Sequence, residues 1–97
     1  MTIPSTVMIA GLEYTVVLEP NCTADGRPCD GYIDYQQLSI HLDEEQVEAA
    51  LVVTFLHEVT HGMAHALGMD HAMSESNVSR WSGTWYQLLR ENPTLFA

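Results

Sequence analysis

Residues 44–67 form a long stretch without proline, and Gly62 is its only internal glycine. Asp43 precedes it as a suitable N-cap, with Gln46 three residues later as in a capping box. Gly68 suits the position immediately after the last helical residue, where a left-handed backbone conformation ends many helices. The sequence therefore predicts one long helix over 44–67, and the rest of the chain has to be arranged around it.

This predicted helix contains the sequence His57-Glu58-Val59-Thr60-His61. Residues i and i+4 lie on one helix face with their Cβ atoms about 5–6 Å apart, so both imidazoles can bind one zinc ion at about 2.0–2.1 Å. Glu58 follows the first histidine, so its carboxylate reaches the space beside the metal without binding it. From there it can accept a proton from the attacking water and pass it to the leaving amine.

The alternative to a metal site is a helix with two surface histidines. The motif, however, is surrounded by apolar residues that predict a largely buried helix: Leu51, Val52, Phe55, Leu56 and Val59. Unpaired histidines and a glutamate would be costly in such surroundings. A zinc site at His57 and His61, with Glu58 as general base, is therefore the preferred interpretation.

A catalytic zinc site needs a third protein ligand and an open position for water. A third histidine six residues after the second is excluded, because Leu67 occupies that position. The remaining candidates are His65, Asp70, His71 and Glu75. His65 lies on the same stripe, but three successive turns rarely share one tetrahedral ion because each step of four rises about 6 Å.

Glu75 lies at the start of a second predicted helix, which Ser74 can cap and which Asn92-Pro93 ends after Glu91. An apolar stripe with the spacing of a helix packed on a neighbour consists of Val78, Trp81, Trp85, Leu88 and Leu89. We therefore expect both tryptophans in the core. Glu75 precedes this stripe on the same side, where a carboxylate needs a strong partner such as zinc. The alternative is a first-turn residue favoured by the helix dipole.

The first half of the chain predicts strands. Residues 7–10 and 13–19 read as a pair with a turn at Gly11-Leu12, and residues 20–30 read as a loop. Residues 31–35 and 38–42 alternate between apolar and polar positions, which indicates two half-buried strands. The sequence therefore predicts one α+β domain over 1–97. It has a small, mostly antiparallel sheet of about four strands, then the motif helix and a second packed helix.

The chain is strongly acidic, with a formal net charge of -10 and three arginines as its only Lys or Arg residues. This charge argues against nucleic acid and against anionic membrane surfaces, and it suits a basic peptide or protein. No signal peptide or membrane-spanning run is visible, which favours the cytoplasm. There we expect Cys22 and Cys29 to be free thiols, although a disulfide or half of a zinc site is also open.

The sequence resembles small zincin-type metallopeptidases of phages and prophages, related to the ImmA/IrrE and SprT-like groups. The motifs that carry this resemblance are the hairpin 7–18, Gly31-Tyr32-Ile33-Asp34, Ile40-His41-Leu42, the helix 54–62 and the tail 87–93. The resemblance implies zinc, a bacterial host cytoplasm and Glu75 as the third ligand. It also implies a strand edge near the metal that holds an extended peptide, for which 38–42 is our candidate.

Zinc-dependent peptide-bond hydrolysis is the function that these features favour. Two alternatives stay open: a non-catalytic zinc-binding interaction or regulatory module, and hydrolysis of a non-peptide amide. His65, His71 and Tyr86 are candidate donors to the oxyanion. A chain of 97 residues has little material for a deep cleft, so we expect an open, shallow site and a requirement for a specific protein substrate.

Overall fold

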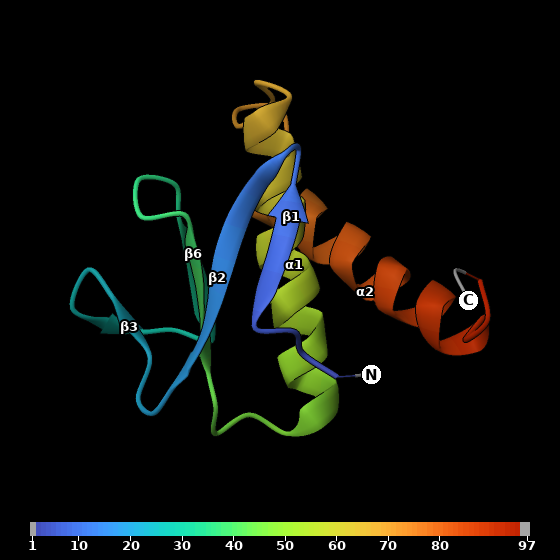
Figure 1. The fold of residues 1–97 in the computed structure, drawn as a ribbon, viewed down its shortest axis with the longest axis horizontal. Coiled ribbons are helices and arrows are strands. Elements are labelled where there is room, and N and C mark those ends of the chain that lie inside the picture. Colours follow the sequence, from blue (N-terminus) through green and yellow to red (C-terminus); the bar gives the residue numbers. More distant parts are fainter. Residues whose placement is uncertain (1, 96–97) are drawn as a thin grey trace.

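The computed structural model describes residues 2–95 and has the predicted α+β architecture. A four-stranded sheet packs against the long helix α1 (Glu48–Ala66), and α2 (Glu75–Glu91) packs against α1. Figure 1 shows α2 diverging from α1 towards its C-terminal end. No helix in residues 2–95 has the length and apolar character needed to cross a membrane.

The main sheet contains β1 (Thr6–Ile9), β2 (Leu12–Glu19), β5 (Gly31–Asp34) and β6 (Ser39–Asp43) in the order β1-β2-β6-β5. The pairs β1–β2 and β5–β6 are antiparallel, whereas β2 and β6 are parallel. The sheet is therefore mostly antiparallel, as predicted, with β5 at the edge next to α1.

The expectation that strand 38–42 offers a free edge is wrong. β6 lies inside the sheet, with Ile40 paired to Val16 on one side and to Ile33 on the other. Its backbone groups are therefore already used by two neighbouring strands. The edge strand on that side of the sheet is β5, which contacts α1.

The prediction of a plain loop over 20–30 is also incomplete. β3 (Thr23–Ala24) and β4 (Arg27–Pro28) form a small antiparallel hairpin that projects from the main sheet (Figure 1). Its turn residues Asp25 and Gly26 have φ values of 53° and 76°. An Asp-Gly pair with positive φ at both positions favours a tight hairpin, so the turn chemistry accounts for this element.

The start of α1 differs from the prediction. The helix begins four residues later, because Asp43 is the last residue of β6 and its carboxylate accepts the Glu45 backbone N–H at 3.0 Å. The Gln46 side chain donates to the Asp43 carbonyl oxygen at 3.0 Å, so it closes a turn and not a capping box. Val47 is the N-cap and makes no side-chain cap hydrogen bond.

The other helix ends follow the prediction. Gly68 has a φ of 68°, and its backbone N–H donates to the His65 carbonyl oxygen at 3.0 Å. Ser74 caps α2, where its hydroxyl oxygen accepts the Asn77 backbone N–H at 3.1 Å. These caps fix the connection between the two helices at both sides.

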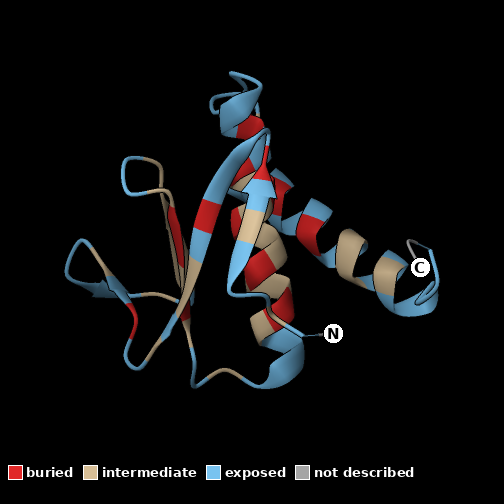
Figure 2. Cartoon of the chain, in the orientation of Figure 1, coloured by how far each residue is buried: buried red, intermediate tan, exposed pale blue. Residues whose placement is uncertain are grey.

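The core lies between the sheet and α1 (Figure 2) and consists of Ile9, Tyr14, Ile40, Leu42 and Phe55. A second contact joins the helices, where Val78 and Ser82 are completely buried. The small Ser82 side chain permits a close approach, and its hydroxyl donates to the Val78 carbonyl oxygen at 2.6 Å. Trp81 is 54% exposed, so its predicted place in the core is wrong; Trp85 is half-buried.

Candidate metal centre

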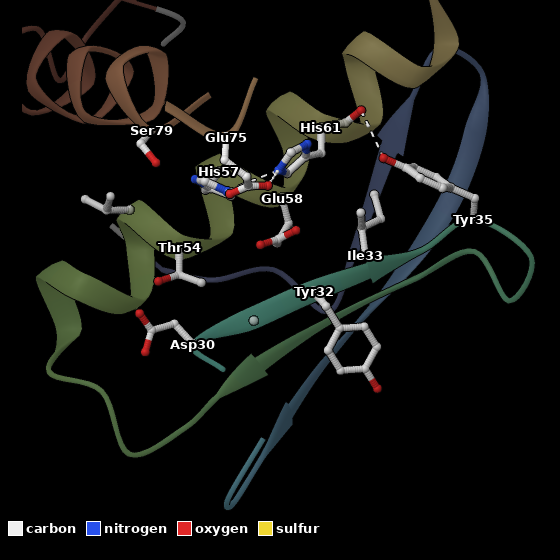
Figure 3. A pocket seen from close by; sticks show the side chains of 12 residues that line it. Asp30, Tyr32, Ile33, Tyr35, Thr54, His57, Glu58, His61, Glu75 and Ser79 are labelled. Carbon is white, nitrogen blue, oxygen red and sulfur yellow. Dashed lines mark hydrogen bonds and ion pairs between the residues drawn. The ribbon is translucent and has the colours of Figure 1, made fainter. Parts of the chain in front are cut away.

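Three of the predicted site residues meet between α1 and α2 (Figure 3). The Nε2 atoms of His57 and His61 lie 3.1 Å apart. Glu75, the first residue of α2, places Oε1 2.6 Å from the Nε2 atom of His61 and Oε2 3.1 Å from that of His57. Among residues 2–95, this is the group of histidine, cysteine and acidic side chains whose donor atoms converge closely enough for one metal ion.

The packing of the helices explains why Glu75 reaches the histidines. His57 and His61 lie one turn apart on the side of α1 that faces α2. The buried Val78 side chain packs the beginning of α2 against α1, and Ser74 caps the first turn. Glu75 lies between these two anchors, so its carboxylate is directed at the paired imidazoles.

The Nε2 atoms of His57 and His61 and the Glu75 carboxylate form a triangle of donor atoms. Hydrogen bonds alone do not satisfy all three groups. With Glu75 ionised, each imidazole can donate one Nε2–H to the carboxylate. Both protons are then used, and the Nε2 atoms of His57 and His61 still face each other at 3.1 Å. If one of these nitrogens is instead unprotonated and accepts a hydrogen bond from the other imidazole, its lone pair faces a carboxylate oxygen. A cation between the three donors would satisfy all of them together.

The donor set and its spacing fit zinc. Two donors bound at about 2.0–2.1 Å to a tetrahedral zinc lie about 3.3 Å apart, close to the separation of the two Nε2 atoms. Two imidazole nitrogens and one carboxylate oxygen are also a common ligand set for a catalytic zinc ion. His57, His61 and Glu75 are therefore the residues that would hold the ion.

Glu58 is the most buried acidic side chain of the site, with 6% of its surface exposed. In Figure 3 its carboxylate points from α1 towards β5, below the triangle of donor atoms. Burial raises its pKa to about 7, and the negative charge of Glu75 adds to this effect. Burial also lowers the pKa of His57; Glu75 opposes this shift and His61 adds to it. A lowered pKa favours the neutral imidazole, the form that binds metals.

A cleft of about 610 Å³ lies between β5 and the two helices and contains the donor atoms. Its wall includes Gly31 of β5, Thr54 of α1 and Ser79 of α2. A Cβ atom on Gly31 would lie 2.7 Å from the His41 carbonyl oxygen and 2.8 Å from the Thr54 methyl carbon. Glycine is thus required where the edge strand passes the helix. Glu75 is 75% exposed, so the expectation that it lies on the packed side of α2, where a carboxylate needs a partner, is wrong.

The other candidate ligands lie outside the triangle. The His65 ring stacks on Tyr35 with centroids 3.8 Å apart, and its Nδ1 atom lies 3.1 Å from the Asp70 carboxylate. These two candidates therefore pair with each other. His71 is exposed in the connection between the helices, and Tyr86 does not line the cleft.

Two cleft residues were not recognised from the sequence. The sequence places Tyr35 at the end of the predicted strand 31–35 and gives it no part in the site, yet its hydroxyl donates to the His61 carbonyl oxygen at 3.3 Å and it lines the cleft. Asp30 was assigned to a loop, yet its side chain points into the cleft near Thr54 (Figure 3). Asp30 directly precedes β5 and Tyr35 directly follows it. Recognising β5 as the edge strand could have identified both residues, but we expected the edge strand at 38–42.

Comparisons with known proteins do not add to this description. No protein-family model, curated protein or solved structure matches the chain. The function must therefore be argued from the site itself.

Proposed function

We propose that this protein is a zinc-dependent peptidase in which His57, His61 and Glu75 hold the metal and Glu58 is the general base. The observation that carries the proposal is the convergence of two imidazoles and one carboxylate next to a second, buried carboxylate. A purely structural zinc site has no use for a buried glutamate beside its ligands, because burying an unpaired carboxylate is costly.

The number of residues that would hold the ion supports catalysis over a structural role. Structural zinc sites are closed by four protein ligands, whereas catalytic sites keep one position for water or substrate. Within residues 2–95 no fourth histidine, cysteine or acidic side chain joins the donor atoms of His57, His61 and Glu75. The cleft gives a substrate direct access to this position.

The edge strand supports an extended peptide as the substrate. β5 runs along the cleft, and no strand within the described residues 2–95 pairs with its outer edge in the sheet. A peptide that adds to this edge would form main-chain hydrogen bonds and lie beside the metal ligands. The proposed peptide-binding strand is therefore β5 (Gly31–Asp34) and not the segment 38–42.

Each polar group has a defined role in this proposal. A zinc ion, when bound, supplies Lewis-acid polarisation of the scissile carbonyl and lowers the pKa of water at the site. The Glu58 carboxylate accepts a proton from the attacking water and donates it to the leaving amine. Val78 and Ser82 keep α2 docked, so that Glu75 stays opposite the two histidines.

Hydrolysis of a random peptide mixture by the zinc-loaded protein tests the proposal, with products identified by mass spectrometry. The wild type should cleave this mixture only weakly, because we expect it to require a specific protein substrate, and chelation should abolish the cleavage. Glu58→Gln should keep its zinc and lose at least about 100-fold in rate, because general base catalysis contributes at least this much. Equal cleavage by Glu58→Gln would contradict the assigned role. Zinc binding without cleavage of any peptide or protein would favour the non-catalytic module.

A further inference from the structure

Cys22 and Cys29 face each other at the base of the β3–β4 hairpin. The hairpin pairs Thr23 with Pro28, so the next pair outward along the same register is Cys22 with Cys29. The Cys29 backbone N–H donates to the Cys22 carbonyl oxygen at 3.1 Å, which extends the ladder to this pair. Their Sγ atoms lie 3.5 Å apart.

We propose that Cys22 and Cys29 form a redox-active dithiol that closes an intrachain disulfide by exchange with a small-molecule disulfide. A disulfide requires the sulfur atoms to approach to about 2.05 Å. The backbone hydrogen bond already holds the two residues opposite each other, so small side-chain rotations are enough to close the bond. This inference is independent of the proposed peptidase activity.

The two sulfurs have different environments, which sets the order of events. Cys22 is 1% exposed, whereas Cys29 is half-buried. Burial raises the pKa of the Cys22 thiol, and hydrogen bonds with Cys29 and Glu19 raise it further. The thiolate is the nucleophile, so a buried thiol with a raised pKa reacts slowly with a bulky disulfide in solution. Cys29 is therefore the sulfur that an external disulfide reaches first.

The exchange is balanced in two steps. The Cys29 thiolate attacks one sulfur of a disulfide RSSR, forms a mixed disulfide and releases RS⁻. Cys22 loses its proton, attacks the Cys29 sulfur and releases the second RS⁻. Protons from the two cysteine thiols end on the two RSH products. The protein loses two electrons and two protons, and the small disulfide gains them.

The backbone that follows this dithiol leads directly into the cleft between β5 and the helices. Cys29 is followed by Asp30, which lines the cleft, and then by β5. The Asp30 carbonyl oxygen accepts the Asp43 backbone N–H at 2.8 Å and a Gln46 side-chain N–H at 3.0 Å. A disulfide at Cys22–Cys29 would fix the hairpin directly before the edge strand.

The test uses the full chain, kept metal-free with EDTA, in buffers of reduced and oxidised glutathione at a series of ratios. Thiols are quenched with acid, alkylated with a maleimide and counted by mass spectrometry. We expect an intrachain disulfide that forms in the monomer. In single variants, Cys22→Ser should form a glutathione adduct at Cys29 at least ten-fold faster than Cys29→Ser forms one at Cys22.

Three outcomes would overturn the proposal: unchanged thiols at every ratio, disulfide-linked dimers in place of the intrachain bond, or equal adduct rates in the two variants. Cys22→Ala gives a second variant if the serine at the buried position perturbs folding, and circular dichroism checks each fold. Cobalt added to a His57→Ala/His61→Ala protein tests a competing use of the thiols. A sulfur-to-cobalt absorption band that Cys22→Ala removes would assign the pair to a metal site instead.

Discussion

The Oε1 atom of Glu75 lies 2.6 Å from the Nε2 atom of His61, although the two residues belong to different helices. This contact makes the docking of α2 on α1 part of the site. A metal ion held by His57, His61 and Glu75 would therefore link the two helices and should stabilise their contact by binding the folded state alone.

Hydrogen exchange in α2 checks this linkage. Zinc should slow exchange of the amides around Val78 and Ser82, because local opening of α2 would require Glu75 to leave the metal. In Glu75→Gln, zinc at the same concentration should slow the exchange of these amides by a factor at least about ten-fold smaller than in the wild type. Equal protection in both proteins would show that zinc binds without involving α2.

The buried carboxylate of Glu58 should make the metal-free protein less stable at alkaline pH. Its pKa is raised from 4.5 to about 7 in the folded state, so the folded protein keeps a proton that the unfolded chain has lost. Below about pH 4.5 both states are protonated and the effect vanishes. As the pH rises from about 4.5 to about 7, the free energy of unfolding should fall by roughly 3 kcal/mol from this group. Above that range the folded state has also lost the proton, so this group causes no further loss.

Urea unfolding at pH 5 and pH 8, with chelator present, measures this effect. Glu58→Gln is the control because glutamine does not titrate, while the histidines remain unchanged in both proteins. The wild type should lose more stability than the variant between the two pH values. Parallel losses would mean that the folded Glu58 titrates like an exposed carboxylate.

Gly31 and Gly83 offer a matched pair of glycine substitutions. Gly31→Ala should destabilise the protein by about 1–3 kcal/mol, because the new methyl group would overlap the His41 carbonyl oxygen and the Thr54 side chain. Gly83→Ala, in α2 with no atom within 4 Å of the added Cβ, should stabilise it by about 0.5–1 kcal/mol. Thermal or urea unfolding distinguishes the two, and opposite signs are the expected result.

Asp30 should favour basic side chains in the substrate, if the protein is a peptidase. The cleft is lined by three carboxylates, Asp30, Glu58 and Glu75, and by no lysine or arginine. Asp30 is the one that lies outside the metal site, and its exposed carboxylate points into the cleft.

Asp30→Asn should weaken the binding of arginine-containing peptides by up to about five-fold at low ionic strength, the range expected for an exposed ion pair. Fluorescence anisotropy with labelled peptides measures this change in the Glu58→Gln background. Glu13→Gln removes the same charge from an exposed position in β2 and should have a smaller effect. If both substitutions weaken binding equally, the preference for basic peptides comes from the net charge alone.

Local patterns predicted the elements that local chemistry determines. Alternation identified the strands, Gly68 and Ser74 marked helix ends, and the His57–His61 spacing identified two metal-site candidates. The start of α1 was misplaced because Asp43 satisfies the capping pattern equally well as a turn residue at the end of β6.

Features that depend on long-range pairing could not be read locally. The parallel pairing of Val16 with Ile40 puts β6 inside the sheet and leaves β5 at the edge, and no short sequence window contains both partners. The exposure of Trp81 has a similar cause, because close packing at Ser82 selects a slightly different face of α2. Glu75 was a candidate from its helix position, but its distances to the histidines depend on that packing.

Zinc titration of the chelator-treated protein tests the central claim most directly, with affinity measured against a chromophoric competitor. The wild type should bind one zinc ion per chain. His57→Ala, His61→Ala and Glu75→Ala should each weaken binding at least about ten-fold, whereas His65→Ala and His71→Ala should change it little. Retention of wild-type affinity in Glu75→Ala, together with its loss in His71→Ala, would contradict the proposed metal centre.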